Sequence, residues 1–377
     1  MSFFSMMRTI FRLREHNNSV ILGHGQAKRL LTGQAGKATG LSVTSPAHTQ
    51  AQHTSGFPLQ SLARLRAHSP SPARWSHTLK LIFLLVIPTL YTFGQTKIAF
   101  VSDTQAPMWI EDVFLKSNNN EKATALLFSE IVNQKPSDLF ILGDVVTLGY
   151  KEKKWKKMDT YIQSCRDAGI ETSALLGNHD VMSNAKKGEK VFQKRFPSHA
   201  RTGFVKITDS VAVVLLNSNF KKLSREDIAT QQSWLKSSLQ KLDNDPAIQV
   251  IVVSCHHAPY SNSKIVGSAE ESQKYFVPLF YQSPKSKLFI TGHSHAFEYF
   301  KREGKDFLVI GGGGGIHQPL KASNATFSDL ASQYKPMFHY LTMTRSGKSL
   351  QLVSHFLKND FSGFEAGYSI NISNESK

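Results

Sequence analysis

The chain has 377 residues, of which 40% are hydrophobic and 10% aromatic. This globular composition excludes collagen-like, coiled-coil and wholly disordered proteins. Its 45 Lys and Arg outnumber 28 Asp and Glu, giving a net charge of +17. Two cysteines, Cys165 and Cys255, are too few for a disulfide scaffold or a thiolate zinc site. Any metal must therefore be held by His, Asp, Glu or Asn.

The basic excess is concentrated at the N-terminus. Residues 1–78 hold nine Lys or Arg and one acid, Glu15, and they are rich in Ser, Thr, Gly and Gln without a sustained apolar period. We expect this stretch to be either a disordered extension or sequence upstream of the true translation start. Lys151–Lys157 and Lys186–Lys190 add local basic runs. Charge runs are usually solvated faces, so we expect no specific nucleic-acid partner.

Residues 79–95 have the layout of a signal peptide. Lys80 precedes an apolar run, Leu81–Leu90, and small or polar residues follow at Gly94 and Gln95. The run is shorter than the ~20 apolar residues of a spanning helix, and Pro88 interrupts it. We therefore expect a signal peptide or a signal-anchor, and a secreted or periplasmic protein that contacts a membrane only if the segment stays uncleaved. Export would allow Cys165 and Cys255 to pair.

The segment 96–358 alternates strand and helix patterns, and 359–377 is predicted to be a polar tail. Helical periodicity covers Glu121–Gln134, Glu152–Ala168 and Glu226–Leu242. Buried strands are predicted at Ile98–Val101, Leu139–Leu142, Ser173–Leu176, Val211–Leu216, Val250–Val253 and Leu288–Ile290, with later β segments at Ala296–Phe300, Phe307–Ile310, His339–Met343 and Ser349–His355. This order predicts an α/β fold, a four-layer α/β/β/α sandwich.

Polar clusters follow five of the predicted strands, at the strand ends where α/β sheets bind ligands. Carboxylates, a carboxamide and imidazoles without thiolates suit Mn, Fe or Zn. A carboxylate can bridge two cations, so the set is large enough for a two-metal centre of the kind that hydrolyses phosphate esters. The clusters are Ser102-Asp103-Thr104-Gln105, Gly143-Asp144, Gly177-Asn178-His179-Asp180, His256-His257-Ala258-Pro259 and Gly292-His293-Ser294-His295.

The ordered series resembles the calcineurin-like metallophosphoesterase superfamily over roughly Lys97–Leu357. The Gly-Asn-His-Asp motif, the stretch from His257 to Asn262 and the glycine run Gly311–Gly315 are most similar to its purple-acid-phosphatase branch. Gly311–Gly315 is either a flexible loop or a backbone that runs close beneath the metal site.

The resemblance implies a role for each site residue. Two Fe, Zn or Mn ions, divalent or trivalent, would share Asp144. Outside the ligands, His179 would act near the leaving group as a general acid or transition-state donor, and Asp180 would orient its ring. The implied ligands are Asp103 and His295 on the first metal, and Asn178, His293 and one of His256 and His257 on the second.

Two positions depart from the family pattern. Gln105 stands where the superfamily usually has His, and an amide is a weaker ligand than an imidazole, so Gln105 is either a weak ligand of the first metal or none. Thr147 stands where purple enzymes carry a metal-bound Tyr, so we expect no purple absorption band.

The sequence thus predicts an exported, metal-dependent phosphoric ester hydrolase that acts on phosphate monoesters through metal-activated water. A phosphodiesterase or nucleotide pyrophosphatase on the same scaffold is the alternative, and a non-catalytic polyanion-binding protein is a more distant one. The expected partner is a small phosphate-ester substrate, and the oligomeric state stays open.

Overall fold

The computed structural model describes residues 96–109, 111, 115–321, 324–331 and 337–373, which belong to one structural unit. The predicted extension (1–78) and signal-like segment (79–95) lie outside the described residues. Within the described part of the chain, no helix is long and apolar enough to cross a membrane.

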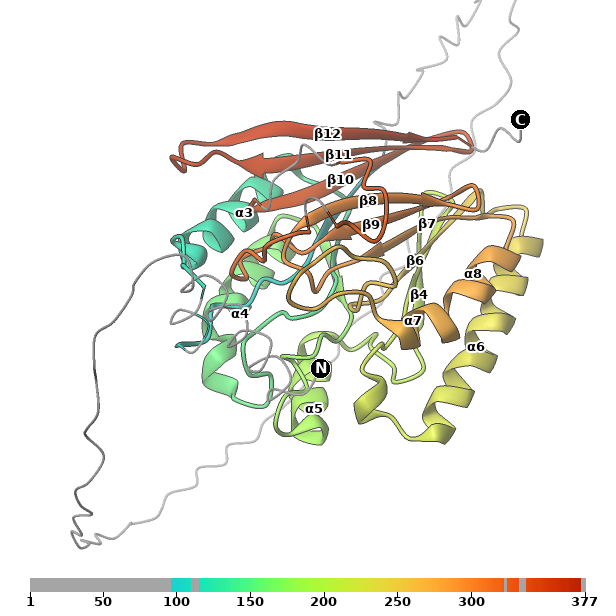
Figure 1. Ribbon diagram of the computed structural model, residues 1–377, viewed down its shortest axis with the longest axis horizontal. Helices are drawn as coiled ribbons and strands as arrows, with labels where there is room; N and C mark the ends of the chain where they lie inside the picture. Colours follow the sequence, from blue (N-terminus) through green and yellow to red (C-terminus); the bar gives the residue numbers. More distant parts are fainter. Residues whose placement is uncertain (1–95, 110, 112–114, 322–323, 332–336, 374–377) are drawn as a thin grey trace, which may run out of the picture. The chain divides into compact units, whose positions relative to one another are not determined.

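Two six-stranded sheets form the centre of the described fold (Figure 1). Their strand orders are β12-β11-β10-β1-β2-β3 and β4-β5-β6-β7-β9-β8. The first sheet contains β1 (Lys97–Val101), β2 (Asp138–Ile141), β3 (Glu171–Ala174), β10 (His339–Ser346), β11 (Ser349–Leu357) and β12 (Phe364–Ile372). The second contains β4 (Phe204–Thr208), β5 (Val211–Leu215), β6 (Val250–Ser254), β7 (Ser286–Thr291), β8 (Phe297–Arg302) and β9 (Lys305–Ile310).

Helices cover the outer face of each sheet. The helix α4 (Glu152–Asp167) buries Trp155, Met158, Ile162 and Cys165, three or four residues apart, and exposes its lysines. The helix α6 (Arg225–Asn244) begins with a capping box between Ser224 and Asp227. On the first sheet lie α3 (Asn120–Gln134), α4 (Glu152–Asp167) and α5 (Ala185–Arg195); on the second lie α6 (Arg225–Asn244), α7 (Glu270–Tyr275) and α8 (Val277–Gln282), and a short 3₁₀ turn, η1 (Phe220–Lys222), precedes α6.

Three clusters of buried apolar side chains lie between the layers of helices and sheets. One cluster lies between α3–α5 and the first sheet, one between the two sheets, and one between the second sheet and α6–α8. The strands β5 and β6 are buried along their whole length because other layers cover both of their faces. The predicted α/β/β/α sandwich is confirmed.

The parallel strands bring the predicted site loops to one edge. In the first sheet Val101 of β1 pairs with Ile141 of β2, which pairs with Ala174 of β3. In the second, Ser254 of β6 pairs with Ile290 of β7. Because each of these strands ends at the same level as its neighbour, the polar clusters that follow them converge.

Several sequence predictions need correction. The predicted tail from 359 contributes β12, which pairs antiparallel with β11, so the fold extends to Ile372. Its alternation of Phe364, Tyr368, Ile370 and Ile372 with polar residues is that of an edge strand, which composition alone hides. The strand β3 begins two residues before its predicted start. The elements α5, α7, α8 and β4 were not predicted because they are short or largely polar.

The two cysteines do not pair. Both are free and buried: Cys165 packs between the first sheet and its helices, and Cys255 packs between the second sheet and its helices. Burial raises the pKa of the Cys165 thiol to about 11 and that of Cys255 to about 12. Both cysteines therefore serve as core side chains.

Candidate metal centre

Two aspartates that follow β1 and β2 are anchored in the same way. Oδ2 of Asp103 accepts a hydrogen bond from the backbone N–H of His293 at 2.9 Å, and Oδ1 of Asp144 accepts one from the backbone N–H of His179 at 2.7 Å. The other oxygen of each carboxylate is buried and has no hydrogen-bond partner among the described residues. Each anchor therefore fixes the direction of a second oxygen that can bind a cation.

The unpartnered atoms face imidazole nitrogens. Nε2 of His256 lies 3.1 Å from Oδ2 of Asp144 and 3.9 Å from Oδ1 of Asp103. Nε2 of His295 lies 3.3 Å from Oδ1 of Asp103. Oδ1 of Asn178 is likewise buried without a partner among the described residues. A buried polar group without a partner costs about 1–3 kcal/mol, so a cluster of them indicates a bound group.

The backbone fixes which nitrogen of each ring faces the centre. Nδ1 of His256 lies 2.9 Å from the carbonyl of Leu142, and Nδ1 of His295 lies 2.6 Å from the carbonyl of Ile316. When each Nδ1 donates to its carbonyl, Nε2 presents a lone pair, as in most metal-ligating histidines.

The electrostatics also favour a cation. Burial alone would lower the pKa of His256 and His295, but the carboxylates of Asp144 and Asp103 outweigh it and raise both pKa values to about 9. Burial opposes ionisation of Asp144, yet the imidazoles of His256 and His179 hold the pKa of that carboxyl well below its usual range. Burial lowers the pKa of His293, which is therefore a neutral ring that can bind metal.

Four residues of the site have strained backbone. Asp103, Asp144, His293 and His295 all have positive φ, between 46° and 73°. For a residue with a side chain this conformation costs roughly 1–2 kcal/mol and is typical of functional sites. The surrounding loops hold the strain through hydrogen bonds such as Gly315 N–H to the carbonyl of Asp103 at 2.8 Å.

Two glycines are required by close packing at the centre. A Cβ on Gly177 would lie 2.2 Å from Oδ1 of Asp144, and one on Gly315 would lie 2.5 Å from the ring of His295. The interpretation that the glycine run brings backbone close beneath the site is therefore confirmed, and Gly311–Gly315 is a packed element of it.

Gln105 reaches the same centre. In one amide orientation, Nε2 donates to the backbone carbonyls of Asp144 at 2.9 Å and Asp103 at 3.2 Å, and Oε1 lies 3.3 Å from Nε2 of His295. The amide oxygen therefore lies beside a ring nitrogen of His295, a residue of one candidate ligand group.

Asp180 does not orient His179 as predicted. Nδ1 of His179 lies 3.2 Å from the carbonyl of Thr147, and its Nε2 faces Oδ2 of Asp144 at 3.9 Å. The carboxylate of Asp180 accepts hydrogen bonds from backbone N–H groups of Gly177, Val145 and Val146. The expected orientation of the His179 ring by Asp180 is therefore wrong, because the backbone N–H groups occupy that carboxylate.

One residue of the site region was missed. Glu298, fully buried in β8, accepts hydrogen bonds from the hydroxyls of Ser261 and Ser294 and from the backbone N–H of Asn262. It thereby joins the loop after β6 to the loop that carries His293. The signal was an acid in the middle of an apolar strand, Phe297-Glu298-Tyr299-Phe300.

Two groups of side chains could hold an ion. Each offers three ligand atoms within 4.8 Å of one another: Asp103, Asp144 and His295 form one group, and Asp144, His256 and His293 form the other. His257 belongs to neither group, and its Nδ1 lies 2.8 Å from the hydroxyl of Ser218. Asp144 is common to both.

Solved structures of other proteins share the fold of this chain. The chain resembles PPD1, a purple acid phosphatase from seeds of yellow lupin (Lupinus luteus), with 15% identity and a TM-score of 0.58; the match covers 74% of this chain and 54% of the lupin protein, about half of its length. It resembles GAP50, the anchor in the inner membrane complex of Plasmodium, with 16% identity and a TM-score of 0.55, over 75% of this chain and 90% of that one. These likenesses show a shared fold.

No curated protein sequence gives a significant match to the chain. The calcineurin-like phosphoesterase family model matches residues 96–297, more than half of the chain, including every predicted site residue. The chain therefore belongs to the calcineurin-like phosphoesterase family.

Proposed function

We propose that the protein is an exported phosphoesterase with two metal ions that hydrolyses phosphate monoesters. The observation that carries the two-metal proposal is the position of Asp144, whose buried Oδ2 has no hydrogen-bond partner in the described structure and which belongs to both candidate ligand groups. The fold likeness to a purple acid phosphatase supports the choice of monoesters.

In this proposal Asp144 would be a ligand common to the two ions. Fe, Zn or Mn ions at this site would supply positive charge for phosphoryl oxygens and would lower the pKa of water. Asp103 and His295, with Gln105 as a weaker ligand, would hold the first ion; Asn178, His293 and His256 would hold the second.

The choice of His256 over His257 rests on the contacts of the two rings. Nε2 of His256 points to the carboxylates of Asp144 and Asp103, whereas His257 is held by the hydroxyl of Ser218 and its ring packs against His293 at 4.5 Å between centroids. His257 therefore supports the ring of His293 from outside the ligand set.

His179 is the proposed proton donor. Its backbone N–H anchors Asp144, and the carbonyl of Thr147 fixes Nδ1, which leaves Nε2 facing the metal centre. A proton on Nε2 can pass to the oxygen of the leaving alcohol as the P–O bond breaks.

The test is hydrolysis of p-nitrophenyl phosphate and bis-p-nitrophenyl phosphate after chelation and re-addition of Mn, Zn or Fe. We expect metal-dependent turnover of the monoester that falls at least about a hundredfold in Asp144→Asn and His179→Ala. Asp167→Asn, an exposed change in α4, is the matched control. Preference for the diester would replace the monoester proposal by a phosphodiesterase or pyrophosphatase, and metal binding without turnover of either ester would favour the polyanion-binding alternative.

Export is proposed from the sequence layout of residues 79–95. Mass spectrometry of the protein from its native cells checks it: a mature N-terminus near Gly94–Gln95 in the extracellular or periplasmic fraction supports export by a cleaved signal. An intact N-terminal segment in a membrane fraction would indicate an anchor.

A further inference from the structure

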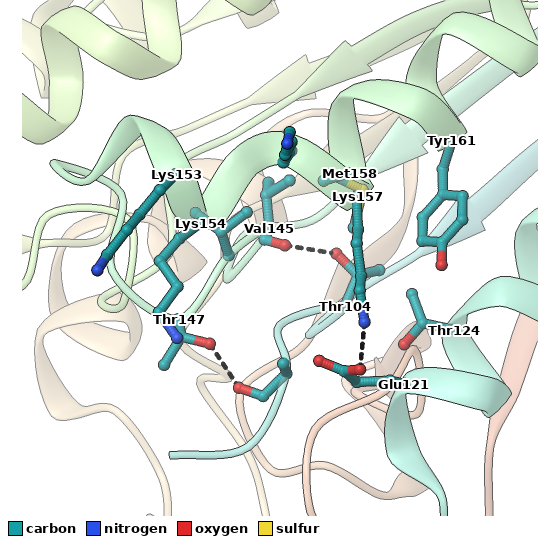
Figure 2. A pocket seen from close by; sticks show the side chains of 13 residues that line it. Thr104, Glu121, Thr124, Val145, Thr147, Lys153, Lys154, Lys157, Met158 and Tyr161 are labelled. Atoms are coloured by element: carbon teal, nitrogen blue, oxygen red, sulfur yellow. Dashed lines mark hydrogen bonds and ion pairs between the residues drawn. The ribbon is translucent and has the colours of Figure 1, made fainter. Parts of the chain in front are cut away.

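A cavity lies outside the set of predicted metal ligands. It has a volume of about 270 Å³ and lies between α3, α4 and the segments that follow β1 and β2. Figure 2 shows α4 along one side of the cavity, with Lys153 and Lys154 near its first turn, then Lys157 and, further along the helix, Tyr161; Lys157 pairs with Glu121 of α3. None of the predicted site residues lines this cavity, and the proposed function gives it no role.

The walls of the cavity are mainly apolar. Val145, Val146 and Met158 contribute aliphatic surface, and the aromatic ring of Tyr161 lines the cavity beside them. The hydroxyl of Thr104 donates to the carbonyl of Val145 at 3.0 Å, so it is already satisfied within the protein. Such walls favour the hydrocarbon or ring portion of a ligand.

The rim is strongly basic. Four lysines of α4 line the cavity: Lys153, Lys154, Lys156 and Lys157. Of these four lysines, only Lys157 has an ion pair with another described residue, Glu121. The other three have none within the described part of the chain, and Lys153 and Lys154 lie in the first turn of α4, where the helix dipole also favours an anion.

The cavity shares its walls with the segments that carry the metal site but contains none of the predicted ligands. Thr104 and Ala106 line it, whereas Asp103 and Gln105, which alternate with them in sequence, face His295. The hydroxyl of Thr147 donates to the carbonyl of Ala106 at 2.5 Å and ties the two wall segments together.

We propose that this cavity binds an organic anion: an apolar body of about ring size enters between α3 and α4, and its phosphate, sulfonate or carboxylate group is held by Lys153 and Lys154. The site is distinct from the metal centre, so binding there does not require the metal ions.

The test uses anilinonaphthalene sulfonate, which combines aromatic rings with an anionic group that a phosphoesterase does not cleave. Its fluorescence is titrated against the full-length protein and two double variants. Lys153→Glu with Lys154→Glu reverses the two charges at the rim. The matched control, Lys186→Glu with Lys187→Glu, makes the same change at the second and third residues of α5, where both lysines are also exposed.

We expect the Kd to rise about tenfold or more in the α4 variant and to stay unchanged in the α5 variant, because the effect of a charge falls with distance and screening. Phenylnaphthylamine, which has the same rings without the sulfonate, should bind alike to all three proteins. Circular dichroism spectra of the variants confirm that each is folded.

Three results would overturn the proposal. An equal loss in both double variants would mean that net charge alone attracts the probe, and no loss in either would mean that the lysines of α4 do not hold it. A third titration, on protein treated with a chelator, should leave the Kd unchanged; a loss there would place the probe on the metal ions.

Discussion

The carboxylate of Asp180 is hydrogen-bonded to the backbone of Val145: Oδ1 of Asp180 accepts the Val145 N–H at 3.1 Å. Oδ2 of the same carboxylate accepts the N–H of Gly177 at 2.9 Å. Asp180 therefore links the loop that follows β2 to the loop that follows β3. Asp144 lies in the first of these loops, so Asp180 acts on the site by holding Asp144 in place.

Replacing Asp180 by Asn tests this relationship. The new amide keeps one acceptor but turns an NH₂ group toward backbone donors, so we expect the free energy of unfolding to fall by about 1–3 kcal/mol. We also expect kcat to fall, because the loop that carries Asp144 is held less firmly. Urea unfolding and steady-state kinetics measure both, and Asp209→Asn, at a partly exposed ion pair with Arg345, is the control. Unchanged stability with a shifted pH–rate profile would instead support a direct action on His179.

Gln105 offers a second test, of metal affinity. Gln105→His supplies an imidazole, the stronger ligand, and should tighten binding of one ion about tenfold, whereas Gln105→Leu removes the oxygen and should weaken it by a similar factor. Competition with a chromophoric chelator measures the affinity. If Gln105→Leu bound both ions as tightly as the unchanged protein, Gln105 would not be a ligand.

The layers and the convergence of the loops could be predicted from the sequence because both depend on patterns that repeat. Buried strands such as Val250–Val253 are continuous apolar runs, and polar clusters directly after such runs must meet at one sheet edge. The edge strand β12 was missed because only one of its faces is buried, so its composition resembles a tail.

Details of the site depend on distances that no spacing encodes. His256 and His257 are adjacent in sequence, and only the contacts of their rings with Asp144 and Ser218 distinguish them. The partner of Asp180 was wrongly predicted for the same reason: a carboxylate beside a histidine in sequence can equally bond to backbone N–H groups from another loop.

Glu298 offers a test of loop positioning. Glu298→Gln keeps the shape but replaces one acceptor oxygen by a donor that faces hydroxyl and N–H groups. We expect unfolding to become easier by about 1–3 kcal/mol and kcat to fall, with KM little changed. Glu365→Gln, at an exposed ion pair with Lys358, is the control. Equal kcat in the variant and the unchanged protein would show that the site does not depend on this link.

The lowered pKa of Glu189 predicts that stability depends on pH. A hydrogen bond from His199, opposed by burial and aided by Arg201, lowers the pKa of Glu189 below its ordinary value of 4.5. The unfolded chain then binds a proton first as pH falls, so the stabilisation is complete above 4.5 and is lost below it.

Glu189→Gln should therefore lower the free energy of unfolding by about 1 kcal/mol near neutral pH, and the difference should shrink as the pH falls below 4.5. Urea unfolding at several pH values measures it. Glu226→Gln, at an exposed carboxyl with no ion pair among the described residues, should show no such trend. A difference that grew toward acid pH would contradict the sign.

Metal removal gives the last prediction. Asp103, Asp144, Asn178 and His256 each have a buried atom without a hydrogen-bond partner in the described structure, so a bound cation compensates the folded state and not the unfolded chain. Metal at a hundred times its Kd should stabilise the protein by about 2.7 kcal/mol. Thermal unfolding should accordingly show a higher Tm with Mn or Zn than after chelation.

The gain in Tm should disappear in Asp144→Asn, which removes the ligand common to both groups, and persist in Asp167→Asn. Equal melting of the chelated and metal-loaded protein would mean that these atoms do not hold a cation, and the two-metal proposal would fail with them.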